Sequence, residues 1–116
     1  MRIARNDPSR PAKDWYHELA QPGLPFIGFA NQGVNDRHYH RQANEIYLVA
    51  RGSSTIVVDD VPVVLHEGDA LVVEPGEVHS FVQNTPEYFH FVLQWPAVGN
   101  DKVAVPWRLS SEIGEG

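Results

Sequence analysis

"HYHRQANEIYLVARG", from His38 to Gly52, is the segment that decides the fold, because a lone glutamate follows two closely spaced histidines at the start of an apolar strand. Alternate residues of a strand share a face, so His38 and His40 point the same way. Glu45 has the wrong parity for one continuous strand. A four-residue hairpin loop formed by "RQAN" would instead set His40 opposite Glu45. The same pairing sets His38 opposite Tyr47, and it predicts three potential ligands on one face.

A second segment, "GDALVVEPGEVHSFVQN", adds a fourth candidate ligand. It ends a strand at a Pro-Gly turn and re-enters the sheet at Val78, so that His79 also lies on a strand. Three neutral imidazoles and one carboxylate leave one or two positions open on an octahedral divalent ion. This donor set suits Fe, Mn, Ni or Zn, and an open position allows a small molecule to bind the ion. We therefore predict one divalent metal ion per chain, with the ligands His38, His40, Glu45 and His79.

The rest of the chain predicts an antiparallel all-β domain. From Phe26 onward, apolar runs rich in Val, Ile, Phe and Tyr alternate with short turn signals such as "RGSS" and "DDVP". No helical period of useful length interrupts them, which favours a sandwich or a barrel. Residues 1–25 are predicted to form an N-terminal arm with a turn of helix between Trp15 and Ala20. The β-barrel domain is predicted over residues 26–108, with "KVAVPW" as an edge strand, and a frayed tail over residues 109–116.

Composition and charge exclude several classes of function. The 116 residues are 42% apolar and 21% charged, which is typical of a globular domain. A net charge of -6, with nine Lys and Arg in no run, provides no basic surface for nucleic acid or for an anionic membrane. No apolar signal or membrane-spanning segment is present, so a cytoplasmic protein is the simplest interpretation. The sequence has no cysteine, so metal ligands must be nitrogen and oxygen atoms.

The first of the two segments resembles a motif of the cupins, in particular the small single-domain cupins. Their pattern of H-x-H followed by E and then G is matched by His38, His40, Glu45 and Gly52. The glycine that opens the family motif is displaced here by one position, to Gly33. The departure concerns a turn, and all three ligand positions of this motif hold the expected residue types.

The second segment resembles the other cupin motif, a G-D pair followed by a P-x-G-x-x-H turn. Gly68, Asp69, Gly76 and His79 match it, whereas Glu74 replaces the usual proline. Asn84 lies one residue later than the family pattern. The resemblance covers about residues 26–95, and it implies a double-stranded β-barrel of the jelly-roll kind, a metal in the barrel mouth and often a homodimer. It does not imply a reaction, because this barrel hosts many chemistries.

Two further side chains are candidates for catalysis, His90 and Tyr47. A hairpin at "NTPE" would place Phe81 opposite His90, on the face of the metal. The alternate residues of this strand, on the face opposite to His90, are more apolar and would ordinarily point into the interior. A shift of the strand register by one residue therefore decides whether His90 faces the pocket. In the pocket, His90 could serve as an acid, a base or a hydrogen-bond donor. Outside the pocket, His90 would be a half-buried histidine that is hydrogen-bonded to a backbone carbonyl. Tyr47 could either contact a ligand or pack in the barrel.

Two functions from different classes fit these features. The first is a mononuclear metal-dependent enzyme, a dioxygenase, isomerase or lyase, which acts on a small oxygen-rich or aromatic molecule that chelates the ion. The second is a non-catalytic module that binds or senses a small molecule in the same barrel. The chain shows no obvious lid and no DNA-binding segment for a regulator. We favour the enzyme, with a small-molecule substrate and without a nucleic-acid or membrane partner.

Overall fold

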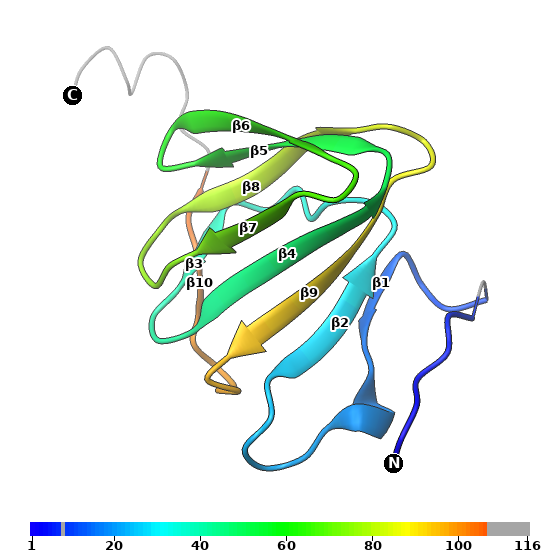
Figure 1. Cartoon of the computed structure of the whole chain (residues 1–116). Helices are drawn as coiled ribbons and strands as arrows, with labels where there is room; N and C mark the ends of the chain where they lie inside the picture. Colours follow the sequence, from blue (N-terminus) through cyan, green and yellow to red (C-terminus); the bar gives the residue numbers. More distant parts are fainter. Residues whose placement is uncertain (8, 107–116) are drawn as a thin grey trace.

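The computed structural model describes residues 1–7 and 9–106, which form two facing antiparallel sheets (Figure 1). The first sheet contains five strands in the order β1 (Lys13–Trp15), β2 (Phe26–Ala30), β9 (Phe89–Trp95), β4 (Asn44–Arg51) and β7 (Ala70–Val73). The second sheet contains, in order, β10 (Lys102–Ala104), β3 (His38–His40), β8 (His79–Asn84), β5 (Ser53–Val58) and β6 (Val61–His66). A short 3-10 helix, η1 (His17–Leu19), is the one helical turn among the described residues.

The predicted all-β fold class is confirmed. The sheets lie face to face as in a jelly roll and do not close into a continuous barrel. The helical turn and the edge strand expected at "KVAVPW" are present as η1 and β10. Residues 1–25 also contribute β1, which pairs with β2 at the edge of the first sheet. The predicted boundary at residue 26 stays a prediction, and the predicted tail at 109–116 lies outside the described residues.

Both hairpins predicted around the site are wrong. β3 pairs with β8 and β10 in the second sheet, whereas β4 pairs with β7 and β9 in the first sheet. Residues 41–43 of the expected loop "RQAN" therefore cross between sheets, and His38 is opposite His79 and not Tyr47. β8 and β9 are likewise in different sheets, so "NTPE" closes no hairpin. In a hairpin, residues must be directly opposite each other to share a face. When the connection crosses between two facing sheets, His40 and Glu45 need only point inward to meet.

The inward faces of the two sheets enclose the main core. Its buried members come from both sheets and from the turn before β9, and they are Tyr47, Val49, Ile56, Leu65, Val73, Phe81, Tyr88 and Val92. A smaller cluster of Tyr16, Phe29 and Phe89 forms where residues of the N-terminal segment pack against the first sheet. On β9 this cluster covers Phe89 from outside, whereas Phe91 and Trp95 of the same parity are exposed and the polar parity faces the interior.

A close approach at Gly33 joins the segment before β3 to this core. The Gly33 amide donates a hydrogen bond to Asn84 Oδ1 at 3.0 Å. A Cβ atom at this position would lie 2.2 Å from Cγ and 2.3 Å from Cβ of Phe81, a side chain that is 2% exposed. Only glycine fits here without displacing the core.

We predict that Gly33→Ala lowers the free energy of unfolding by about 1–3 kcal/mol, because the added methyl group overpacks against Phe81. Urea unfolding followed by circular dichroism measures the change. Gly99→Ala is the matched control, since a Cβ at Gly99 meets no atom within 4 Å. Equal stabilities of the two variants would contradict the close approach.

Candidate metal centre

The four predicted ligands converge between the sheets. His38 and His40 from β3 and His79 from β8 face Glu45, which comes from β4 on the opposite sheet. Glu45 Oε1 lies 2.9 Å from His79 Nε2, 3.0 Å from His40 Nε2 and 3.8 Å from His38 Nε2. All four side chains are buried, and their ligand atoms lie within 4.8 Å of one another. This geometry is what a single bound ion requires.

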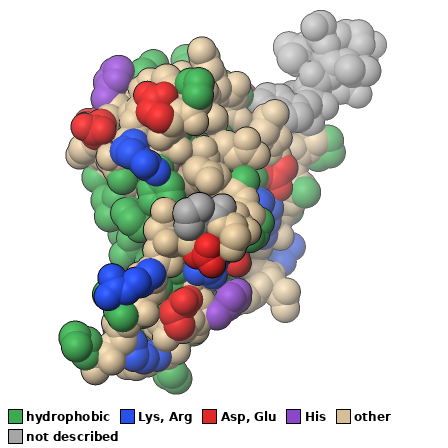
Figure 2. Space-filling model, turned by 90° about the vertical axis from the view of Figure 1, so that its right-hand side faces the viewer, with side chains coloured by type: hydrophobic (Ala, Val, Ile, Leu, Met, Phe, Trp, Pro, Cys, Tyr) green, Lys and Arg blue, Asp and Glu red, His purple; other side chains and the backbone are tan. Residues whose placement is uncertain are grey.

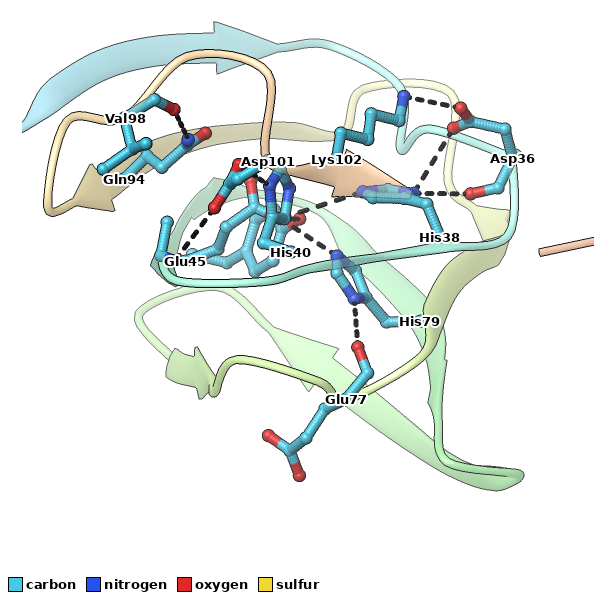
Figure 3. Close-up of polar contacts among 12 residues, drawn as sticks. Asp36, His38, His40, Glu45, Glu77, His79, Gln94, Val98, Asp101 and Lys102 are labelled. Atoms are coloured by element: carbon cyan, nitrogen blue, oxygen red, sulfur yellow. Dashed lines mark hydrogen bonds and ion pairs between the residues drawn. The ribbon is translucent and has the colours of Figure 1, made fainter. Parts of the chain in front are cut away.

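Each histidine has its second ring nitrogen, Nδ1, bound to an oxygen atom outside the cluster (Figure 3). His38 Nδ1 lies 2.8 Å from the carbonyl oxygen of Asp36, and His79 Nδ1 lies 2.9 Å from the carbonyl oxygen of Glu77. His40 Nδ1 lies 2.8 Å from Asp101 Oδ1. Carbonyl and carboxylate oxygens only accept hydrogen bonds, so Nδ1 carries the proton in each ring. The lone pair of each neutral imidazole is then on Nε2 and points into the cluster.

This arrangement fits a metal ion. Without a cation between them, the Nε2 lone pairs of the three neutral histidines would face the negatively charged carboxylate of Glu45, which is a repulsive contact. Burial by itself raises the pKa of Glu45, but hydrogen bonds from the three imidazoles, which require a proton on Nε2, outweigh burial and lower it, so the carboxylate is charged. Burial lowers the pKa of His40, but Glu45 and Asp101 outweigh burial and raise it. Both shifts reflect a site that favours positive charge next to Glu45. A divalent ion supplies that charge without occupying the Nδ1 hydrogen bonds.

Asp101 is a buried member of the site that the sequence reasoning missed. It precedes β10, and its Oδ2 accepts hydrogen bonds from the amides of Gln42 and Ala43 at 3.2 and 3.0 Å. Its other oxygen holds His40. Burial raises the pKa of Asp101, but hydrogen bonds from His40 and from the two amides outweigh it and lower the pKa. No motif marks a single aspartate in a loop, and the only available signal was the edge strand predicted directly after it.

A cavity of about 340 Å³ opens beside the four-residue cluster and includes three of its members, His38, His40 and Glu45, in its lining. Its wall also contains His90, Tyr47 and Gln94 from the first sheet. His90 is 2% exposed and lies on the inward parity of β9, so the structure settles the orientation that the sequence left open.

His90 is held as a neutral side chain. Its Nδ1 lies 2.6 Å from the Tyr88 hydroxyl, and the rings of Tyr47 and Phe81 pack around it with centroid distances of 5.0 and 5.2 Å. Burial lowers the pKa of His90 to about 4, although the charge of Glu45 opposes this shift. At neutral pH the ring can therefore donate or accept a hydrogen bond, but it carries no charge.

Tyr47 packs in the interior and also borders the cavity, whereas its contact with a ligand stays a prediction. The hydroxyl donates a hydrogen bond to Glu45 Oε1 at 3.2 Å. Burial and the charge of Glu45 raise the pKa of Tyr47 well above its usual range, so the phenol keeps its proton. It acts on the candidate ligand Glu45 as a hydrogen-bond donor.

We predict that Asp101→Asn weakens divalent metal affinity about 10- to 100-fold. The amide oxygen can still accept from the backbone of Gln42 and Ala43, but its NH2 group then faces His40 and favours the tautomer with the proton on Nε2. Isothermal titration with Zn²⁺ measures the change. Asp60→Asn, at a turn residue whose side chain is 87% exposed, is the control, and an unchanged affinity in Asp101→Asn would rule out the positioning role.

We predict that His90 destabilises the fold in acid. An unfolded histidine takes up a proton near pH 6.5, whereas folded His90 resists protonation until pH is about 4. The folded state therefore loses stability as the pH falls through this window, by about 3 kcal/mol in total. Urea unfolding of the metal-free protein at pH 7 and pH 4 measures the loss, and His90→Gln should reduce it. An identical pH dependence in the variant would contradict the low pKa.

Comparison with known proteins places the chain in a family. Residues 26–95 match the cupin domain family, whereas no curated protein matches the sequence. Pac13, a nucleoside dehydratase from Streptomyces, has a similar structure with 16% identity and a TM-score of 0.68, covering 97% of this chain and 89% of that chain. KdgF from Halomonas sp. has 18% identity and a TM-score of 0.63, with 81% of this chain and 87% of that chain covered.

A cupin protein from Bacteroides fragilis is similar over 97% of this chain and 93% of its own, with 18% identity and a TM-score of 0.59. Identities this low show a shared fold and nothing about activity. The match to the family itself includes all four residues of the cluster and extends over more than half of the sequence. The chain therefore belongs to the cupin domain family.

Proposed function

We propose that the protein is a mononuclear metal-dependent enzyme that acts on a small oxygen-rich or aromatic molecule. One observation carries the proposal: three imidazoles with their Nδ1 protons committed elsewhere aim Nε2 at a buried carboxylate beside a cavity. Four such donors suit Fe, Mn, Ni or Zn and leave room for a substrate oxygen on the ion. When bound, the ion would act as a Lewis acid that polarises this oxygen.

The other cavity residues would orient the substrate. His90 Nε2 has no hydrogen-bond partner among the described residues, and the ring lines the cavity. If the Tyr88 hydroxyl donates to Nδ1, the proton of His90 is on Nε2, where it can donate to a substrate oxygen. Of the roles considered for His90, the neutral donor fits its pKa of about 4 best. Tyr47 would hold the Glu45 carboxylate in place through its hydroxyl.

The donor set by itself is compatible with dioxygenation, isomerisation and elimination. Pac13 is described as a nucleoside dehydratase, and variants of it have been crystallised with uridine. A dehydration is an elimination, which makes the lyase class the first to test here. The similarity is one of fold, so this support comes from analogy.

A non-catalytic module that binds or senses a small molecule is the second candidate. The cavity wall has few groups that could act as a base: Glu45 belongs to the candidate metal site, and Asp14 is paired with Arg10 at 3.2 Å. His90 is a weak base because burial lowers its pKa to about 4. A binding protein would need only the walls and the ion.

The predicted homodimer and cytoplasmic location stay predictions. Hydrophobic side chains gather toward the left of the view in Figure 2. Exposed apolar residues on β4, β7 and β9 include Leu48, Val72, Phe91 and Trp95, an arrangement that would suit a covered surface. No helix in the described part of the chain is long and apolar enough to cross a membrane.

We predict that untagged protein contains about one Fe, Mn, Ni or Zn ion per chain by inductively coupled plasma mass spectrometry, and that His79→Ala loses it. His79 contributes one of the four converging ligand atoms. His66→Ala is the matched control, since His66 is an exposed histidine at the end of β6. Full occupancy in His79→Ala would disprove the proposed ligand set.

The same proteins separate the two candidate functions. Iron in the wild type directs the assay to oxygen consumption, and zinc or manganese directs it to dehydration and isomerisation of small hydroxylated substrates. Turnover that disappears in His79→Ala supports the enzyme. Stoichiometric ligand binding without turnover would favour the binding module, and a wild type that takes up none of the four ions would leave the cavity as a metal-free binding site.

A further inference from the structure

The sequence contains only two lysines, and both line the cavity beside the metal centre. Lys13 is on β1, the edge strand of the first sheet, and Lys102 is on β10, the edge strand of the second. In register, Lys13 pairs with Ala30, which pairs in turn with the inward-facing His90. Lys102 pairs with the candidate ligand His40. Both lysines therefore lie on the inward parity of the two strands that border the cavity, and both are exposed where they line it.

The acidic residues near the lysines leave part of this positive charge uncompensated. Lys102 Nζ lies 2.6 Å from Asp36 Oδ2, beside His38 (Figure 3). Asp14 also lines the cavity, but it is bound to Arg10. Lys13 has no hydrogen bond or ion pair with a described residue, and its charge helps Lys102 to lower the pKa of Asp36, the carboxylate that both lysines share. A divalent ion bound with Glu45 would add a further net charge of about +1, within a protein whose formal net charge is -6.

A flat apolar surface lies beside Lys13 on the same strand. Trp15 has the same inward parity and pairs with Gly28 on β2. A Cβ atom on Gly28 would lie 2.8 Å from Trp15 Cε3, so the indole packs directly against the backbone of β2. Trp15 lines the cavity, and its ring is 5.8 Å from that of Phe26. A planar ligand could stack against this wall.

Lys13, Trp15 and Lys102 lie outside residues 26–95, the part that matches the cupin family. The four candidate metal ligands lie inside it. The shared part of the fold therefore supplies the metal centre, whereas the flanking segments supply the charged and aromatic border of its cavity. Selection among ligands that all bind the ion would depend on this border.

We propose that the cavity selects an anionic chelator: a molecule whose metal-binding oxygens are separated by a planar apolar portion from a carboxylate or phosphate group. Lys13 and Lys102 would bind the anionic group through charge-assisted hydrogen bonds, and Trp15 would contact the planar portion. This inference rests on the proposed metal site, because the ion would hold the other end of the molecule.

Paired chelators of known structure test the proposal on zinc-loaded full-length protein. Catechol supplies two chelating oxygens on a planar ring, 3,4-dihydroxybenzoate adds a carboxylate at the far side, and 3,4-dihydroxyphenylphosphonate adds a phosphonate there. Isothermal titration calorimetry should show that at least one anionic probe binds about tenfold or more tightly than catechol. The preferred anionic probe indicates whether a carboxylate or a phosphate-like group fits.

Variants separate the contribution of the lysines to binding affinity from the intrinsic chelating strength of each probe. In the double variant Lys13→Gln/Lys102→Gln, the ratio of the affinity for the anionic probe to the affinity for catechol should fall to about a third or less of the wild-type ratio. The affinity for catechol itself should stay within about twofold of the wild-type value. Lys13→Gln alone leaves the Lys102–Asp36 pair beside His38 intact and should show part of the loss. Arg5→Gln, at an exposed cationic residue that does not line this cavity, should keep the wild-type ratio.

The outcomes distinguish this inference from the proposed function. If zinc and catechol bind but the ratio is the same in wild type and the double variant, the anionic selection is wrong and the metal site stands. If the protein retains no zinc and binds no chelator, both proposals are overturned. A ratio that decreases as NaCl is raised to about 0.5 M supports a charge-based preference, because salt screens exposed charges.

Discussion

The buried carboxylate of Glu45 is the constraint on which the rest of the site depends. Removing an ionised carboxylate from water costs several kcal/mol unless opposite charge and hydrogen bonds compensate it. Its immediate surroundings are three imidazoles and the Tyr47 hydroxyl. Since the Nδ1 protons of the imidazoles are bound elsewhere, neutral rings cannot donate to Glu45. Compensation must come from additional protons or from a metal ion, and a bound ion would provide it while the imidazoles stay neutral.

The histidines are oriented in two different ways, and the reason lies in their positions on the strands. His38 and His79 each begin a strand, and each binds the carbonyl oxygen two residues earlier, in the preceding loop. His40 ends β3, and the residue two before it is His38, whose backbone belongs to the strand. Strand carbonyls are directed toward neighbouring strands. His40 therefore needs an acceptor from elsewhere, and Asp101 provides it.

The sequence predicted the right cluster through a wrong local structure. A short connection after His40 is compatible with a hairpin and with a crossing between sheets, and both bring Glu45 to the same interior space. Parity alone cannot distinguish these solutions, because each satisfies the requirement that polar ligands point inward. The β-class and the edge strand β10 followed from periodicity and turn residues. Asp101, Lys13 and Trp15 could not be assigned, since their roles arise from contacts between distant segments.

The order of Asp101 and Lys102 in the chain links the metal centre to the border of the cavity. Asp101 binds Nδ1 of His40, on the far side of the ring from the cluster, whereas Lys102, the next residue, lines the cavity and pairs in register with His40. The backbone of residue 101 is also fixed, because its carbonyl accepts a hydrogen bond from the Arg41 amide at 3.0 Å. A displacement of β10 would therefore move a cation of the cavity and the acceptor that orients His40 together. If the cavity selects its ligand as proposed, selection and metal geometry would be coupled through this short strand, and ligand contacts with Lys102 would also stabilise the orientation of His40.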